Sequence, residues 1–457
     1  MILPTGKYIH NTNFRLLDNW SVQYLIESTF LYNPIYKLVR IGEFLHKSRN
    51  QILIETGKKY QRVTIKINNG GVIPRDVEQG ENIGTKQQFI VGEGQFLMSK
   101  IDARNGAFGI VPKQLEGAIV TNDFPAFEVN KGIINPEFLV LITTTKEFIK
   151  FAQSCSSGTT NRQRIDIPSF LNVKIPLPSL EEQNQIVQAY NNRIIEAKRL
   201  EDEAKSLGKE IKKYLFDQLG VVKNNSSIAI NGLSFLAYKE IERWALSHLL
   251  KQRLYSFKNV KHPILPIKTL LTFFEGGKTP STSRNDFWGG DIYWTSAKDM
   301  KELYLKSAQD KITKLAVKEG GLKVYPKGTL LGVFRSGILR HSFPVALTEA
   351  ETAINQDLKA MGINEEMVQK DYFLNYLNVF QKMILERSQK EGVTVESINT
   401  DEFLEIPVII PPIETQRIIS THIQSIRNEV ANKKNQAESN RQLAITEFES
   451  KIFMPCN

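Results

Sequence analysis

A chain of 457 residues is too long for one ordinary hydrophobic core and predicts two domains joined by connecting segments. Its 59 Lys and Arg residues outnumber 49 Asp and Glu residues, and the net charge of +10 favours a polyanionic partner over an acidic one. The two cysteines lie far apart and exclude a disulfide framework. No apolar run is long enough to span a bilayer, and residues 1–7 lack a signal-peptide pattern. We therefore expect a soluble cytoplasmic protein.

The first half is expected to contain strands that lead into basic loops. A turn glycine, Gly94, opens a run of apolar and β-forming residues, and residues 99–107 follow as a tight loop. Arg and Asn are the side chains best suited to bidentate contacts with guanine and adenine edges. Candidate nucleic-acid contacts of this half are Lys100, Arg104, Asn105, Arg162 and Arg164. Each of them could equally be a solvated surface charge.

A long helix is predicted after the proline-rich segment that ends at Pro178. Apolar residues recur there at helical spacing: Ile186, Tyr190, Ile194, Ala197, Leu200, Ala204, Leu207, Ile211 and Leu215. Roughly 35 to 40 helical residues would reach about 55 to 60 Å, which suits a spacer. Gly208 weakens this helix locally, and residues 223–227 read as a polar linker.

The second half carries its own basic loop, residues 276–284. This loop is flexible, rich in hydroxyl groups and basic at both ends, which suits contacts with phosphate oxygens. The tryptophans that follow it are expected in the core rather than stacked on bases. Candidate contacts of this half are Lys278, Thr279, Ser281, Arg284, Lys298, Arg335 and Arg340.

A second long helix is predicted near the end of the chain, from a stripe of apolar residues that comprises Ile419, Ile423, Ile426, Val430, Ala437, Ala444, Phe448 and Ile452.

Similar short sequences, used here as landmarks, also recur in the same order in the two halves of the chain. They are Trp20–Leu25 with Trp244–Leu249, Gly94–Leu97 with Gly328–Leu331, Thr121–Phe124 with Asn355–Leu358, and Phe170–Gln183 with Phe403–Gln416. We therefore predict a duplicated chain. Either helix could pack back on its own domain, but two equivalent stripes favour helices that bury against each other.

Several fragments of the sequence resemble catalytic motifs, but each lacks a residue that the motif requires. Gly277-Lys278-Thr279 resembles the end of a phosphate-binding P-loop, but Thr272 stands where that loop needs a glycine. Residues 33–36 resemble an adenine methyltransferase loop without its second proline or a methyl-donor motif. Asp357-Leu358-Lys359 lacks an upstream acidic partner, and the six histidines are scattered. We therefore expect no active site, no metal and no cofactor.

The order of these elements resembles that of a known protein family. Residues 277–281 followed by residues 287–294 resemble the opening of a target-recognition domain in the specificity subunits of type I restriction-modification systems, and residues 99–110 are similar to another variety of that domain. The proline-rich segments 175–183 and 409–416 resemble the entry into the family's conserved helices. The likeness covers nearly the whole chain except residues 1–13.

This resemblance implies an α+β protein. It would have two tandem target-recognition domains of mixed α/β structure, at residues 1–178 and 234–411. Spacer helices at residues 179–220 and 412–453 would pack as an antiparallel coiled coil, with a linker at residues 221–233. Each domain would read one half of a split, asymmetric double-stranded DNA site.

The resemblance also implies partners. Two methyltransferase subunits and a restriction and translocation subunit would carry out the catalysis, and this chain would supply only the recognition of the DNA sequence. The alternatives are a specificity subunit or module of a combined restriction and methylation enzyme, and a DNA-binding regulator that acts alone.

Overall fold

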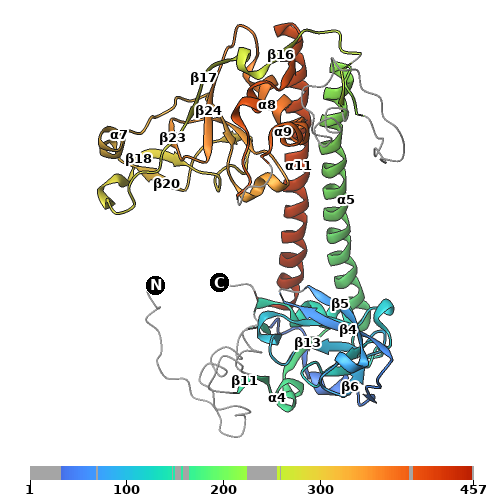
Figure 1. The fold of residues 1–457 in the computed structure, drawn as a ribbon. Helices are drawn as coiled ribbons and strands as arrows, with labels where there is room; N and C mark the ends of the chain where they lie inside the picture. Colours follow the sequence, from blue (N-terminus) through green and yellow to red (C-terminus); the bar gives the residue numbers. More distant parts are fainter. Residues whose placement is uncertain are drawn as a thin grey trace. The chain divides into compact units, whose positions relative to one another are not determined.

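The computed structural model describes residues 32–67, 70–146, 148–149, 156–157, 164–223, 255–257, 259–390 and 395–454. The chain divides into two compact units, Met1–Arg199 with Gln436–Asn457, and Leu200–Asn435. Each unit combines one mixed α/β domain with part of each of two long helices (Figure 1). Trp20–Leu25, Trp244–Leu249, Arg162 and most of the predicted linker lie outside the described residues.

The first unit contains two main sheets. A four-stranded sheet has the order β2-β10-β7-β8, and a five-stranded sheet has the order β3-β6-β9-β4-β5. Two short antiparallel pairs join β1 to β13 and β11 to β12. The bounds are β1 (Lys37–Arg40), β2 (Leu45–Lys47), β3 (Gln51–Leu53), β4 (Lys59–Lys66), β5 (Gly71–Gln79), β6 (Gln87–Ile90), β7 (Phe96–Met98), β8 (Phe108–Ile110), β9 (Ile119–Val120), β10 (Ala126–Val129), β11 (Ser156–Ser157), β12 (Arg164–Ile165) and β13 (Lys174–Leu177).

Short helices of the first unit are held by polar caps and a phenylalanine core. The helices are α2 (Pro136–Thr143) and α4 (Ile167–Asn172), with 3-10 turns η2 (Ile41–Glu43), η3 (Gly80–Asn82), η4 (Ala103–Asn105) and η5 (Lys113–Leu115). Asn135 caps α2 by accepting hydrogen bonds from two backbone amides of its first turn. Phe170 of α4 packs against Phe96 and Phe108, with ring centroids 6.3 and 6.2 Å away. The predicted landmark Phe170 is therefore a core residue.

The second unit repeats this plan with different strands. A five-stranded sheet has the order β17-β24-β21-β22-β19, and a three-stranded sheet has the order β20-β18-β23. The pair β16 and β25 corresponds to β1 and β13 of the first unit. The bounds are β14 (Val222–Lys223), β15 (Tyr255–Ser256), β16 (Ile264–Pro266), β17 (Leu271–Gly276), β18 (Trp288–Thr295), β19 (Tyr304–Leu305), β20 (Asp310–Ile312), β21 (Leu330–Val333), β22 (Val345–Thr348), β23 (Thr352–Ile354), β24 (Leu358–Ile363) and β25 (Pro407–Ile409).

The helices of the second unit also repeat the first. They are α7 (Lys314–Gly320), α8 (Lys370–Val379), α9 (Gln381–Ser388) and α10 (Thr400–Leu404), with η7 (Ile267–Leu270), η8 (Asn285–Phe287) and η9 (Gly337–Arg340). Phe403 of α10 takes the place of Phe170 and packs against Phe334 and Phe343, with centroids 4.9 and 5.6 Å away. The landmarks Phe170 and Phe403 thus occupy equivalent core positions.

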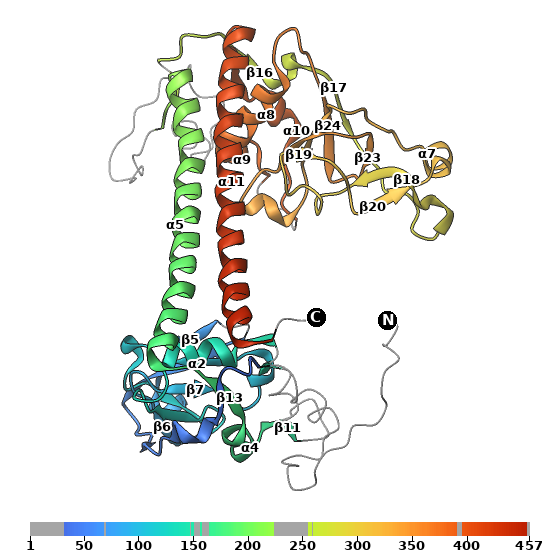
Figure 2. The same ribbon diagram turned by 180° about the vertical axis from the view of Figure 1, so that it is seen from behind.

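Two helices of 40 residues each, α5 (Leu180–Leu219) and α11 (Ile413–Ile452), follow the two domains. Within each unit their segments lie side by side, as the green and red ribbons of Figure 1 and Figure 2 show. In the second unit Lys433 pairs with Glu203 at 2.8 Å, and His422 packs on Tyr214 at 4.1 Å, so the two segments are antiparallel there. In the first unit Arg193 pairs with Glu447 at 2.7 Å.

Candidate nucleic-acid interface

One loop takes the same place in both units, directly after a buried central strand. It follows β7 and contains η4 in the first unit, and it follows β21 and contains η9 in the second. Lys100 and Phe334 stand at corresponding points of its backbone. Their matching hydrogen bonds are Lys100 N to Asp123 O (2.8 Å) with Ile165 N to Lys100 O (3.0 Å), and Phe334 N to Asp357 O (2.8 Å) with Ile398 N to Phe334 O (2.8 Å). Lys100, Arg104 and Asn105 therefore lie on the loop equivalent to that of Arg335 and Arg340.

In the first unit this loop contributes to a cluster of positive charge around Asp123. Arg164 donates two hydrogen bonds to the Asp123 carboxylate, at 3.1 and 3.3 Å. Burial lowers the pKa of Lys100, and the charges of Lys47 and Arg164 lower it further against the opposing effect of Asp123. Crowded cations beside one carboxylate leave an excess of positive charge, which attracts phosphate oxygens. Asn105 is exposed on the same loop as Lys100.

In the second unit the hydroxyl-rich loop between β17 and β18 is held by backbone contacts. The Lys278 amide donates to Ile354 O at 3.0 Å, and the Trp294 indole donates to Lys278 O at 3.1 Å. Trp288 likewise donates to Ser281 O at 3.2 Å. Trp294 is buried, so it supports the loop from the core, in line with its predicted role. Lys278, Thr279 and Ser281 are left exposed on a fixed backbone.

Several candidate cations are paired with carboxylates at the surface. Arg284 contacts Asp286 at 2.6 Å and Glu319 at 3.1 Å, and these hydrogen bonds raise its pKa. The other pairs are Lys298 with Asp310 (2.8 Å) and Arg340 with Glu396 (3.1 Å). Exposed ion pairs contribute little to stability, so a DNA phosphate could replace the carboxylate at small cost. The Arg335 side chain is exposed.

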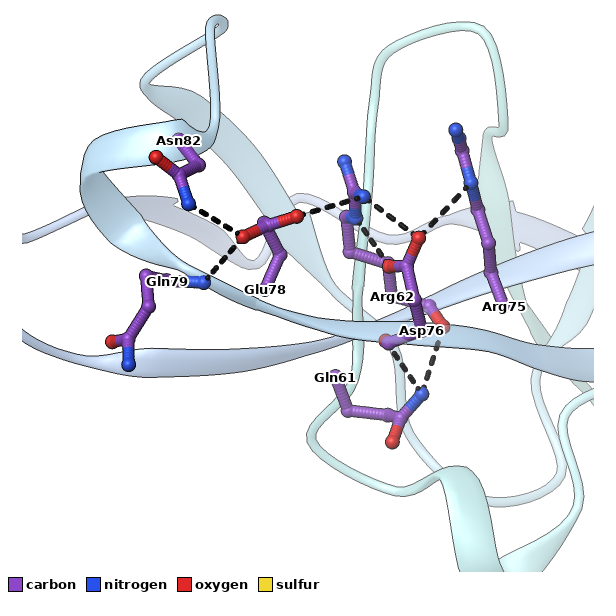
Figure 3. Close-up of polar contacts among 7 residues, drawn as sticks. All are labelled: Gln61, Arg62, Arg75, Asp76, Glu78, Gln79 and Asn82. Atoms are coloured by element: carbon purple, nitrogen blue, oxygen red, sulfur yellow. Dashed lines mark hydrogen bonds and ion pairs between the residues drawn. The ribbon is translucent and has the colours of Figure 1, made fainter.

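A charged hairpin of the first unit escaped the sequence prediction (Figure 3). Arg62 on β4 donates to both carboxylate oxygens of Asp76 on β5, at 2.6 and 2.7 Å, and lies 3.7 Å from Glu78. This pairing lowers the pKa of Asp76, chiefly through the hydrogen bond. Arg75 approaches Asp76 at 3.5 Å. The bidentate contact holds the Arg62 guanidinium in one orientation while Arg75 stays 60% exposed.

The family of this chain is decided by two matched stretches of sequence. The sequence model of the type I restriction modification DNA specificity domain matches residues 35–201 and 264–439. The chain belongs to this family of specificity subunits. Membership supports recognition of DNA by sequence, and the two matches agree with the two equivalent loops described above.

Relatives of this specificity subunit match different shares of its length. The EcoR124I/EcoR124II specificity subunit of Escherichia coli is 35% identical over 146 residues, which are 32% of this chain and 36% of that protein. The MjaIX specificity subunit of Methanocaldococcus jannaschii is 31% identical over 181 residues, which are 38% of this chain and 40% of that protein. The HindI specificity subunit of Haemophilus influenzae is 19% identical over 417 residues, 80% of this chain and 90% of that protein.

A solved chain supports the fold of the specificity subunit. It comes from work on complex assembly and conformational transition of the type I R-M system, and it is 18% identical with a TM-score of 0.59. The alignment covers 92% of this chain and 99% of that chain. At this identity the likeness shows the mixed α/β fold alone.

The predicted contacts fall into separate groups of the specificity subunit. Lys100 and Arg164 lie in one neighbourhood of the first unit, and Asn105 lies on the same loop as Lys100, whereas the structure describes only the backbone of Arg104. Lys278, Thr279, Ser281 and Arg284 share one loop of the second unit, and Arg335 and Arg340 lie on another. Among the described residues no group of three or more His, Cys, Asp or Glu could hold a metal ion. No helix in this part of the chain is long and apolar enough to cross a membrane.

Proposed function

We propose that this chain reads an asymmetric, bipartite DNA site and directs partner methyltransferase and restriction subunits to it, without catalysing a reaction itself. The observation that carries this proposal is one recognition loop at equivalent places in two units with different side chains. Lys100 and Asn105 stand on the first loop, whereas Arg335 and Arg340 stand on the second. Different side chains select different base edges, so the two half-sites should differ.

The long helices would act as a spacer between the two recognition domains. We propose that α5 and α11 pack as an antiparallel coiled coil, with domains at residues 1–178 and 234–411 on either side. Support comes from the pairs Lys433 with Glu203 and His422 with Tyr214, and from burial of Ala197, Ala204, Ala437 and Ala444 along the helices. Helices of 40 residues reach about 60 Å, enough to separate half-sites that lie about 34 Å apart on one face of B-DNA.

The contacts with DNA would come from the exposed cations and amides of the recognition loops. We propose Lys100, Arg104, Asn105, Arg162 and Arg164 for one half-site, and Lys278, Thr279, Ser281, Arg284, Lys298, Arg335 and Arg340 for the other. Arg and Asn would read base edges, while Lys and the hydroxyl side chains would hold phosphates. Arg62 and Arg75 of the hairpin in Figure 3 are further basic groups on the first domain.

Partners would supply the chemistry. The relatives are named as specificity subunits of type I restriction enzymes, so an enzyme complex with separate catalytic chains is the natural setting. We propose two methyltransferase subunits, which would flip and methylate adenine with S-adenosylmethionine, and one restriction and translocation subunit.

The experiment that tests the proposal is purification of the tagged chain from its own cells with identification of bound proteins and mapping of methylated genomic sites. We expect an adenine methyltransferase in about twofold excess, and methylation at a split, asymmetric motif that disappears when the gene is deleted. Purification of the chain alone, with tight binding to one site, would favour the stand-alone regulator. A single partner that both cuts and methylates would favour the combined enzyme.

A further inference from the structure

Each long helix carries a fully buried glutamine in its first turn, Gln183 in α5 and Gln416 in α11. Both side chains are 0% exposed. Both occupy the fourth residue of their helix, counted from Leu180 and Ile413. Burial of a polar amide costs free energy unless its donors and acceptor are all bonded, so such a residue needs a structural explanation.

The two glutamines make the same three hydrogen bonds. In each, the amide nitrogen donates to the carbonyl of a proline that follows the last strand of the domain, β13 or β25, which we call the exit strand. It also donates to a carbonyl just before an earlier helix of the same domain, α2 or α8, and the amide oxygen accepts from the backbone N–H of that helix's N-cap residue. The bonds are Gln183 Nε2 to Pro178 O (2.9 Å) and Ile133 O (3.2 Å), Asn135 N to Gln183 Oε1 (2.8 Å), Gln416 Nε2 to Pro411 O (2.8 Å) and Met367 O (3.2 Å), and Gln369 N to Gln416 Oε1 (2.8 Å).

Each glutamine therefore joins a long helix to its own domain at two separate points. Asn135 caps α2 and Gln369 caps α8, so the amide ties the start of the long helix to a packed helix as well as to the segment that follows the exit strand. The surrounding contacts differ: Asn135 Nδ2 bonds Asn184 in the first unit, whereas Ser420 bonds the Gln369 side chain in the second. The three glutamine bonds, by contrast, are the same in both units.

We infer that Gln183 and Gln416 are positioning residues that fix the direction in which each long helix leaves its domain, and thereby set the gap length between the two half-sites. This inference rests on the proposed function. A tilt of about 5° at one end of a helix of about 60 Å moves its far end by about 5 Å, which exceeds the rise of one base pair, about 3.4 Å. A fixed joint is therefore needed for discrimination of gap length to one base pair.

The test compares Gln183→Met and Gln416→Met with the unaltered chain, assembled with its partners. Methionine has a similar volume but can form neither the two donor bonds nor the acceptor bond. Binding constants are measured on DNAs whose gap is one base pair shorter than, equal to, or one base pair longer than the mapped site. We expect each variant to lose at least threefold of the preference for the natural gap, while binding to a single half-site changes less than twofold.

A matched control separates positioning from general stability. Gln88 on β6 is also buried, at 3% exposed, and its side-chain amide donates a hydrogen bond to Thr85 O at 2.7 Å. This bond involves no residue of a long helix. Gln88→Met should lower the thermal unfolding midpoint without altering the gap preference. Gln183→Leu and Gln416→Leu, which also remove both donors and the acceptor but place a stiffer apolar side chain of similar volume there, replace any methionine variant that does not fold.

The outcomes are distinguishable. Gap preferences that stay unchanged in the joint variants, or that fall equally in Gln88→Met, would overturn the positioning role and leave the proposed function intact. An unaltered complex that binds no split site would overturn the proposed function, and the positioning role with it.

Discussion

Lys100 stands apart from the other candidate lysines because it is partly buried and two of its charged neighbours, Lys47 and Arg164, are positive. Burial, Lys47 and Arg164 all act against its protonated form, while Asp123 favours that form. The positive charge of Lys100 is therefore poorly compensated in the free chain, and a DNA phosphate oxygen placed beside it would stabilise that charge. This makes Lys100 the residue at which pH and DNA binding should be most closely linked.

We expect DNA affinity to fall as pH rises through the lowered pKa of Lys100, before lysines with ordinary values near 10.4 lose their protons. Lys100→Arg keeps its charge and should move this loss to higher pH. The free energy of unfolding of the chain should change in the opposite direction to DNA affinity as pH rises. Since the unfolded chain binds more protons between the folded and unfolded pKa values, stability rises with pH there. Fluorescence anisotropy and thermal unfolding from about pH 7 to pH 10 measure both effects, and identical binding curves for the two chains would contradict the assignment.

Elements set by local sequence were the most predictable part of the molecule. The apolar stripes 186–215 and 419–452 predicted two long helices because helical periodicity is carried by residues close in sequence. The position of α5 after Pro178 also agreed with the structure. Helix α5 continues through Gly208, because one glycine costs less than the surrounding helix gains, and the expected local weakness there stays a prediction.

Features that depend on long-range pairing could not be predicted in this way. The contact between Arg62 and Asp76 requires the register of β4 against β5, which includes an irregularity between Arg62 and Val63. The run Asn68–Gly71 is a turn signal that could have suggested this hairpin. Two of the three bonds of Gln183 likewise involve backbone about 50 residues away. Such contacts are fixed by tertiary packing rather than by local pattern.

Gly208→Ala should stabilise α5 by about 0.5 to 1 kcal/mol, because alanine loses less backbone entropy in a helix. A Cβ atom at Gly208 would meet nothing within 4 Å. Gly117 is the matched control: its Cβ would also meet nothing within 4 Å, but its φ is +78°. Gly117→Ala should therefore destabilise by about 1 to 2 kcal/mol. Urea unfolding of both variants tests the pair, and a destabilised Gly208→Ala would indicate that the helix needs this glycine.

At the scale of the whole molecule, each unit carries a loop with a proposed phosphate contact, the loop after β7 in the first unit and the loop between β17 and β18 in the second. Lys100 belongs to the first unit and Lys278 to the second. Electrostatic contacts with phosphates release counterions, so each contact adds to the salt dependence of binding independently of base sequence. Contributions from two separate units should then be nearly additive.

Lys100→Gln and Lys278→Gln should each reduce the slope of log K against log salt concentration by about 1, and the double variant should reduce it by about 2. Each single variant should weaken binding to all sequences alike, because phosphate contacts carry no base preference. Lys174→Gln, on the exit strand β13 rather than on a recognition loop, serves as the control and should leave the slope unchanged. Titrations between about 50 and 200 mM salt measure the slopes. If both loop variants kept the slope of the unaltered chain, the positive charge of these loops would not meet the phosphates, and another surface would have to supply the affinity for DNA.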